Sequence, residues 1–91
     1  MRQYELTLIF KPQLTEEQAD AIIEKLKLKI IHQQVWGKRM LAYPIEKEKE
    51  GLYVHVVVDL EQSSIPALEE KIRLNENIIR HLLVIAEKQM V

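Results

Sequence analysis

The sequence predicts an α+β fold in which a four-stranded antiparallel sheet carries two helices on one face. Four segments have the extended pattern of strands, and two repeat apolar residues every three to four positions, as amphipathic helices do. Their order along the chain is β-α-β-β-α-β. Two right-handed crossover connections then give the strand order 2-3-1-4, which is the ferredoxin-like architecture. Because this architecture serves many functions, the fold alone does not decide what the protein does.

The first strand and the first helix are expected in the N-terminal third. Residues 3–10 alternate between an apolar and a mixed face, and the apolar face consists of Tyr4, Leu6, Leu8 and Phe10. Residues 15–28 are expected to form the helix, because Thr15 and Gln18 have the spacing of a capping box. The apolar stripe of this helix consists of Ala19, Ile22, Ile23 and Leu26.

A pair of strands is expected in the middle of the chain. Residues 30–45 have an extended pattern, in which Gly37 indicates a bulge or a bend. The charged residues 46–50, closed by Gly51, are expected to form an exposed hairpin turn. The next strand covers residues 52–60, and its apolar face consists of Leu52, Val54, Val56, Val58 and Leu60.

The second helix and the last strand complete the pattern. Ser63 or Ser64 is expected to cap the helix, with Pro66 in its first turn, and the last strand is expected over residues 78–87. Residues 1–91 are thus expected to fold as one domain. The predicted core consists of Leu6, Leu8, Ile22, Ile23, Leu26, Val54, Val56, Val58, Leu68 and Ile72.

The composition excludes several classes of chemistry. The 91 residues include no cysteine, which excludes thiol catalysis, iron–sulfur clusters and cysteine-based zinc sites. No signal peptide is expected, and no apolar run approaches the roughly 20 residues of a membrane span. The net charge of −1 argues against coating nucleic acid through bulk charge, but it allows a local basic patch.

The sequence signals for a catalytic site or a metal site are weak. His32, His55 and His81 fall on three different strands, so ordinary positions on the sheet are favoured over a metal site. The two glycines, Gly37 and Gly51, cannot build a glycine-rich phosphate loop. No serine has an evident base and orienting partner. We therefore expect neither an enzyme nor a bound metal, cofactor or small-molecule substrate.

Two segments bear on RNA binding. Residues 50–56 faintly resemble a strand of the RNA-recognition motif, but the stacking positions carry Leu52 and Val54, so base stacking on the sheet face is not expected. Residues 36–39 place a tryptophan, a glycine and two cations together, and such side chains stack on unpaired bases or contact phosphates. A second interpretation stays open, in which Trp36 only anchors the packing of its strand.

Four blocks of sequence, in order, resemble one protein family. They are residues 1–5 (MRQYE), 36–45 (WGKRMLAYPI), 51–54 (GLYV) and 73–80 (RLNENIIR). These blocks resemble the family of the sixth protein of the bacterial small ribosomal subunit. The family has a ferredoxin-like fold, which agrees with the pattern of elements.

The resemblance implies a structural role in the small subunit of a cytoplasmic ribosome, or of an organellar one. A family member would bind small-subunit ribosomal RNA at a multi-helix junction of the central domain, together with the eighteenth small-subunit protein. Carried over by motif, the RNA-facing residues are Arg2, Lys38, Arg39, Arg73 and Arg80. The expected surface for the protein partner consists of Tyr43, Pro44 and Ile45.

The connection after the first helix departs from the family pattern. Family members usually have a longer first helix and a glycine-containing loop before the second strand. In this chain residues 26–29 run almost directly into Ile30, so the helix is expected to end early or the strand to start late. The extended C-terminal tail of some members is also expected to be missing.

A different class of function remains open from the residues alone. The chain could be a ferredoxin-like regulatory or small-ligand-binding domain that self-associates through its uncovered sheet face. That face would be lined by Ile9, Tyr53, His55 and Val57. Size-exclusion behaviour and a filter-binding assay with ribosomal RNA would separate the two interpretations.

Overall fold

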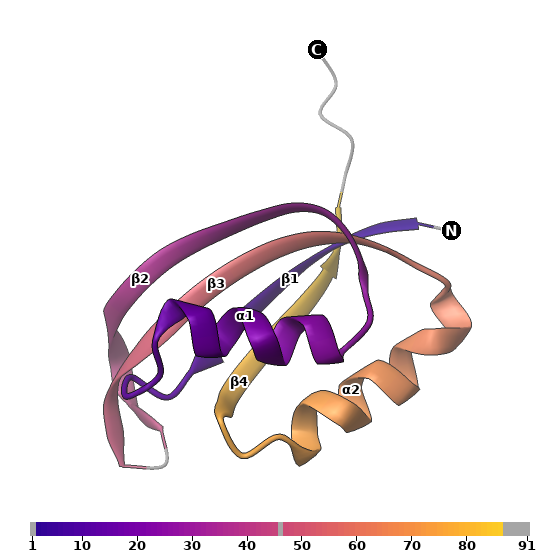
Figure 1. Ribbon diagram of the computed structural model, residues 1–91. Coiled ribbons are helices and arrows are strands. Elements are labelled where there is room, and N and C mark those ends of the chain that lie inside the picture. The colour runs from indigo at the N-terminus through magenta and orange to yellow at the C-terminus, as the bar shows by residue number, and fades with distance from the viewer. Residues whose placement is uncertain (1, 46, 87–91) are drawn as a thin grey trace.

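Four strands form one antiparallel sheet in the order β2-β3-β1-β4, and two helices cover one of its faces (Figure 1). The computed structural model describes residues 2–45 and 47–86. The predicted α+β, ferredoxin-like arrangement is therefore confirmed. The elements in chain order are β1 (Arg2–Phe10), α1 (Glu16–Lys25), β2 (Lys29–Ile45), β3 (Glu48–Leu60), a 3₁₀ turn (Gln62–Ser64), α2 (Ile65–Leu74) and β4 (Ile78–Ile85).

The core lies between the sheet and the two helices. Alternate residues of the central strands β1 and β3 point toward the helices, because successive side chains of a strand point to opposite faces. Nine of the ten predicted core residues are buried, and the tenth, Ile22, is half-buried on α1. The buried apolar cluster consists of Tyr4, Leu6, Leu8, Phe10, Ala19, Ile23, Leu26, Leu52, Val54, Val56, Val58, Leu60, Leu68, Ile72 and Ile78.

Helix α1 begins as predicted and ends earlier. The Gln18 amide N–H donates to the Thr15 hydroxyl at 3.2 Å, and the Thr15 amide N–H donates to the Gln18 side chain at 2.9 Å, so the capping box is present. The helix ends at Lys25 and not at residue 28, while β2 begins at Lys29, so of the two alternatives expected for this connection the early end of the helix is the one found. The reason is that Lys27 adopts a left-handed conformation, with φ of 54°, which turns the chain into β2.

Helix α2 starts without the side-chain cap that was predicted. Ser64 occupies the N-cap position, but its hydroxyl donates to the carbonyl of Glu61 at 2.7 Å and accepts from no helix N–H. The residue already has helical backbone angles, since a 3₁₀ turn leads directly into α2. Pro66 lies in the first turn, as predicted, and Asn75 ends the helix.

The hairpin of β2 and β3 is interrupted at three places in its register. One interruption lies at Gly37, whose φ of 86° confirms the predicted bulge. The segment expected to be a turn is shorter than residues 46–50, because β3 already begins at Glu48, which pairs with Ile45. Glu46 lies outside the described residues, as does the predicted end of the last strand at residue 87.

Candidate functional site

The face of the sheet opposite the helices, here called the open face, is uncovered by any described element. Cross-strand pairs place Thr7 beside His55 and Ile9 beside Tyr53 on this face. Strand β4 adds Arg80 and Leu82, which pair with Ile9 and Thr7. The open face is therefore a mixture of aromatic, apolar and charged side chains, and it holds some of the candidate residues.

Three rings stack on the open face. The ring centroids of Trp36 and His55 lie 5.2 Å apart with planes at 10°, and those of Trp36 and Tyr53 lie 6.5 Å apart at 16°. Trp36 reaches this face because the register shifts between Val35 and Gly37, which inserts Trp36 as an extra residue on the edge strand β2. These are ordinary geometries for stacked aromatic rings, and the Trp36 side chain remains 40% exposed.

The His55 ring is held from the β1 side. Its Nδ1 lies 3.1 Å from the Thr7 hydroxyl, and its Nε2 lies 3.2 Å from Oε1 of Glu5. Both ring nitrogens therefore have a partner, which fixes the plane of the imidazole. Trp36 thus stacks on a ring whose orientation is determined by two hydrogen-bonding contacts.

The adjacent cations Lys38 and Arg39 point to opposite faces. Lys38 pairs with Leu52, a core position, whereas Arg39 pairs with Gly51 on the open face. The Arg39 guanidinium carbon lies 5.9 Å from the centroid of the Trp36 ring, and its Nε donates weakly to the Trp36 carbonyl at 3.4 Å. The bend at Gly37 therefore does not bring the two cations onto one face.

A hydrogen bond crosses one end of the open face. The Arg80 guanidinium donates to the Tyr43 hydroxyl at 2.6 Å. Next to this bond is a hollow of about 230 Å³, with largely apolar walls. It is lined by Thr7, Ile9, Tyr53, Arg80, His81 and Leu82. Pro44 is exposed and Ile45 is half-buried. Of residues 43–45, Tyr43 is linked to the hollow through its hydrogen bond to Arg80.

The remaining candidate cations lie elsewhere. Arg2 pairs with Leu60 at the far end of the sheet, about 23 Å along β1 from the position beside Arg80. Arg73 lies on α2, where its guanidinium donates to the Glu70 carboxylate at 2.6 Å. The hydrogen bonding to Glu70 and the negative charge of that carboxylate raise the pKa of Arg73.

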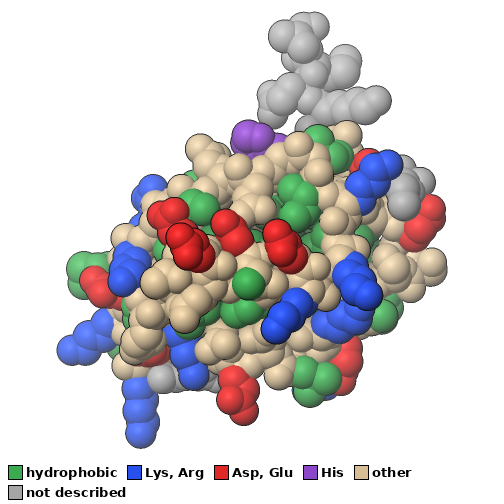
Figure 2. Space-filling model, in the orientation of Figure 1, with side chains coloured by type: hydrophobic (Ala, Val, Ile, Leu, Met, Phe, Trp, Pro, Cys, Tyr) green, Lys and Arg blue, Asp and Glu red, His purple; other side chains and the backbone are tan. Residues whose placement is uncertain are grey.

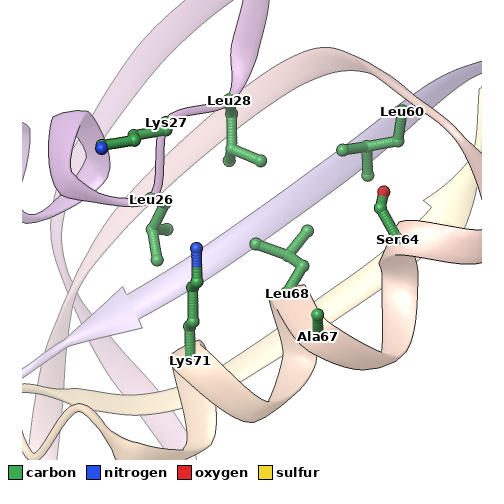
Figure 3. A pocket seen from close by; sticks show the side chains of 8 residues that line it. All are labelled: Leu26, Lys27, Leu28, Leu60, Ser64, Ala67, Leu68 and Lys71. Carbon is green, nitrogen blue, oxygen red and sulfur yellow. The ribbon is translucent and has the colours of Figure 1, made fainter.

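The helix-covered face has a different character. Acidic side chains are grouped on this face near α1 (Figure 2). A second hollow, of about 210 Å³, separates the C-terminal end of α1 from α2 (Figure 3). Its walls are mostly leucine and alanine side chains, with Lys71 extending past Leu26 and Lys27 directed away. Nothing in this hollow resembles a catalytic arrangement.

The three histidines do not converge. His81 is on the helix side, where its Nε2 lies 2.9 Å from Oε2 of Glu69, while His55 is on the open face and His32 is exposed on β2. Within residues 2–45 and 47–86, no group of three metal-ligating side chains is close enough to hold an ion. In the same ranges, no helix is long and apolar enough to cross a membrane.

Comparisons with known proteins decide the family. The model of the family described as ribosomal protein S6 matches residues 3–85. The chain belongs to the ribosomal protein S6 family. It is 36% identical to the small ribosomal subunit protein bS6 of Desulforamulus reducens, over 92% of this chain and 96% of the relative. It is 38% identical to that of Clostridioides difficile, over 94% of this chain and all of the relative.

A solved structure agrees with this assignment. The crystal structure of 30S ribosomal protein S6 from Thermotoga maritima superposes with a TM-score of 0.82 at 28% identity, covering 93% of this chain and 87% of that one. The chain is therefore a protein of the small ribosomal subunit and not an enzyme, as the sequence predicted. The predicted location on the cytoplasmic ribosome is confirmed by the same family membership.

The structure brings together only some of the residues that the S6 resemblance nominated. Arg80 and Tyr43 are joined by a hydrogen bond at one end of the open face, and Arg39 lies on the same face at that end, with its guanidinium next to Trp36. Pro44 and Ile45 follow Tyr43 in the chain. Lys38 lies on the helix side of β2, Arg2 at the opposite end of the sheet, and Arg73 on α2. The roles of these eight residues stay predictions.

The sequence did not predict the row of stacked rings. Alternation along β3 correctly assigned Tyr53 and His55 to the uncovered face of the sheet, but it did not place Trp36 against them. The orientation of Trp36 could not be read in this way, because it depends on the register shift at Gly37.

Proposed function

We propose that this S6 family member binds small-subunit ribosomal RNA in the central domain, as a pair with the eighteenth small-subunit ribosomal protein. The observation that supports the proposal is the hydrogen bond between Arg80 and Tyr43 at one end of the open face, the same end at which Arg39 lies next to Trp36. It places one guanidinium beside an accessible tyrosine and an apolar hollow, and a second guanidinium on the same face. Phosphates and a protein side chain could therefore be bound side by side.

The charges of Arg39 and Arg80 are available to phosphate groups. Among residues 2–45 and 47–86, neither guanidinium has a carboxylate partner, and both side chains are exposed. Arg73 differs, because its guanidinium is already engaged by Glu70. Guanidinium groups bind phosphate oxygens well because their N–H groups are arranged in a planar fork.

The helix side is less suited to RNA. The exposed surface of α1 carries Glu16, Glu17 and Glu24, with Asp20 half-buried beside them. Carboxylates at this density repel phosphate at short range. RNA is therefore expected to approach the end of the sheet that carries Arg39 and Arg80, and to avoid α1.

The protein partner is assigned to residues 43–45 and the hollow beside Arg80. The hollow is large enough for one apolar side chain and has largely apolar walls. Tyr43, which is hydrogen-bonded to the lining residue Arg80, and the following Pro44 are both exposed. A partner that fills the hollow would lie beside the Arg80–Tyr43 hydrogen bond, so the partner and Arg80 together would give a composite surface for RNA.

The test is an affinity measurement with a central-domain fragment of small-subunit ribosomal RNA, with and without the eighteenth protein. We expect weak binding alone and much tighter binding with the partner, because a net charge of −1 gives little long-range attraction. Arg39→Ala combined with Arg80→Ala should weaken the complex, whereas Lys25→Ala on α1 serves as the control. Nanomolar binding by the isolated chain, unchanged by the partner, would contradict the proposal.

A further inference from the structure

The Trp36 indole is accessible even though tryptophan is a residue that proteins usually bury. It is the only tryptophan of the chain, it lies on the edge strand β2, and it is 40% exposed. The buried apolar cluster does not include it. Its packing partners are the rings of Tyr53 and His55, themselves on the outside of the sheet. The indole therefore contributes to a surface more than to the core.

The surface is preorganised for stacking. His55 lies behind the indole at a plane angle of 10°, and its two ring nitrogens contact Thr7 and Glu5. Gly37, with φ of 86°, sets the bulge that turns the indole to this face. A flat group that stacked here would meet a plane already held in place, so little conformational entropy would be lost on binding.

Arg39 leaves room for such a group. Its guanidinium carbon is 5.9 Å from the indole centroid, close to the outer limit of a cation–π contact of about 6 Å. Atoms in close contact between stacked planes are only about 3.5–4.0 Å apart. The guanidinium is thus near the indole without covering it closely. Its hydrogen bond to the Trp36 carbonyl is long, at 3.4 Å, so it is easily displaced toward a phosphate.

We propose that Trp36 stacks on an unpaired nucleobase of ribosomal RNA, while Arg39 contacts the phosphate of that nucleotide. This inference rests on the proposed function and names the kind of RNA feature that the open face recognises. Aromatic side chains bind unpaired bases through stacking, and a neighbouring cation neutralises the backbone. The stacking site differs from the RNA-recognition motif, because the indole comes from the edge strand and not from the central one.

The solitary tryptophan provides a direct measurement. The complete chain is titrated with the central-domain RNA fragment and the eighteenth protein, and Trp36 emission is followed with the partner's own signal subtracted. Trp36→Leu is expected to lower RNA affinity roughly 5- to 150-fold, the range for one stacked base. Trp36→Phe retains a ring and should keep most of the affinity. RNA should quench Trp36 emission in the wild-type protein, which requires no substitution.

The outcomes separate this inference from the function on which it rests. If the wild-type complex binds RNA but Trp36→Leu binds equally well, or emission does not change on adding RNA, the stacking inference is wrong and the proposed function stands. If Trp36→Leu weakens binding of the eighteenth protein in the absence of RNA, the indole belongs to a protein interface and the inference is also wrong. If the wild-type protein binds no RNA even with its partner, both are overturned. The urea midpoint of each variant shows whether a loss of RNA affinity reflects unfolding. If a variant is unfolded, the change in Trp36 emission of the wild-type protein on adding RNA decides the question.

Discussion

The guanidinium of Arg80 and the hydroxyl of Tyr43 are joined by a 2.6 Å hydrogen bond that links the two edge strands of the sheet. Strands β2 and β4 are separated by β3 and β1, which corresponds to roughly 14 Å at the usual spacing. The bond forms because β2 leaves its regular register between Met40 and Ile45. Arg80 from β4 and Tyr43 from β2 therefore lie together across one end of the open face.

Tyr43→Phe removes the acceptor of this bond while leaving the ring. Both side chains are exposed, so the free energy of unfolding should change by less than about 0.5 kcal/mol. RNA affinity in the presence of the partner should fall, because Arg80 loses the contact that orients it. In a double-mutant cycle, Arg80→Ala should cost less in the Tyr43→Phe background than in the wild type. Additive losses would show that the hydrogen bond does not position Arg80.

Val56→Ala tests the assignment of the core face of β3. Val56 is fully buried, and the substitution removes two methyl groups and leaves a cavity. It should destabilise the protein by about 1–3 kcal/mol. Val57→Ala, on the other face and half-buried, is the matched control and should cost less. Urea unfolding followed by circular dichroism measures both, and an unchanged midpoint for Val56→Ala would contradict the assignment.

Lys27→Gly is expected to stabilise the protein. Lys27 follows the C-cap of α1 with φ of 54°, a conformation that costs a residue with a Cβ about 1 kcal/mol. Glycine adopts it freely but loses roughly 0.5–1 kcal/mol more through entropy on folding, so the net gain should be small, up to about 0.5 kcal/mol. Lys27→Ala removes the charge and retains the Cβ. Thermal unfolding should therefore show a higher Tm for the glycine variant than for the alanine variant.

Gly51→Ala should be destabilising for a steric reason. A Cβ at position 51 would collide with Cγ2 of Ile9, a branched side chain held beneath it. Overpacking of this kind costs about 1–3 kcal/mol. Ile9→Ala removes the colliding carbon, so the double variant should be more stable than the sum of the single losses predicts. Ile9→Val keeps Cγ2 and should give no such relief, which makes it the matched control.

The strands were predictable from the sequence because the alternation of apolar and polar residues along a strand directly reflects which side chains are buried. Residues such as Leu6 and Val56 are apolar where the sheet faces the helices, and the neighbours of each point outward. The residue at which α1 ends was not predictable in the same way. A lysine at position 27 gives no signal for a left-handed conformation, which glycine usually marks. Likewise, no pattern in the sequence around Ser64 indicated the 3₁₀ turn before α2.

The candidate site was predictable in part for a related reason. The sequence placed Lys38 and Arg39 next to each other, and alternation correctly indicated that consecutive side chains diverge. The meeting of Arg80 with Tyr43 joins residues 37 positions apart, so no local pattern reports it. Contacts that depend on strand order and on bulges can be recognised only once the structure of the sheet is known.

The salt dependence of RNA binding distinguishes the cations of the two faces. A phosphate contact releases condensed counterions, so each lost contact should flatten the slope of log affinity against log salt by about 0.7–0.9. Arg39→Ala and Arg80→Ala should each have this effect, because both guanidinium groups lie at the proposed RNA surface without a carboxylate partner among the described residues. Lys38→Ala should change the slope less, since Lys38 points to the helix side.

Arg73→Ala is the informative control in the same series. Its guanidinium is held by Glu70, so releasing it to phosphate would require breaking that pair. We expect this variant to have a salt slope close to that of the wild type. None of the four alanine variants, at positions 38, 39, 73 and 80, should change which RNA sequence is preferred, because phosphate contacts do not read bases. Wild-type slopes for both Arg39→Ala and Arg80→Ala would remove this end of the open face from the RNA interface. A flattened slope for Arg73→Ala alone would move the interface to α2, where the Glu70 pair would have to open on binding.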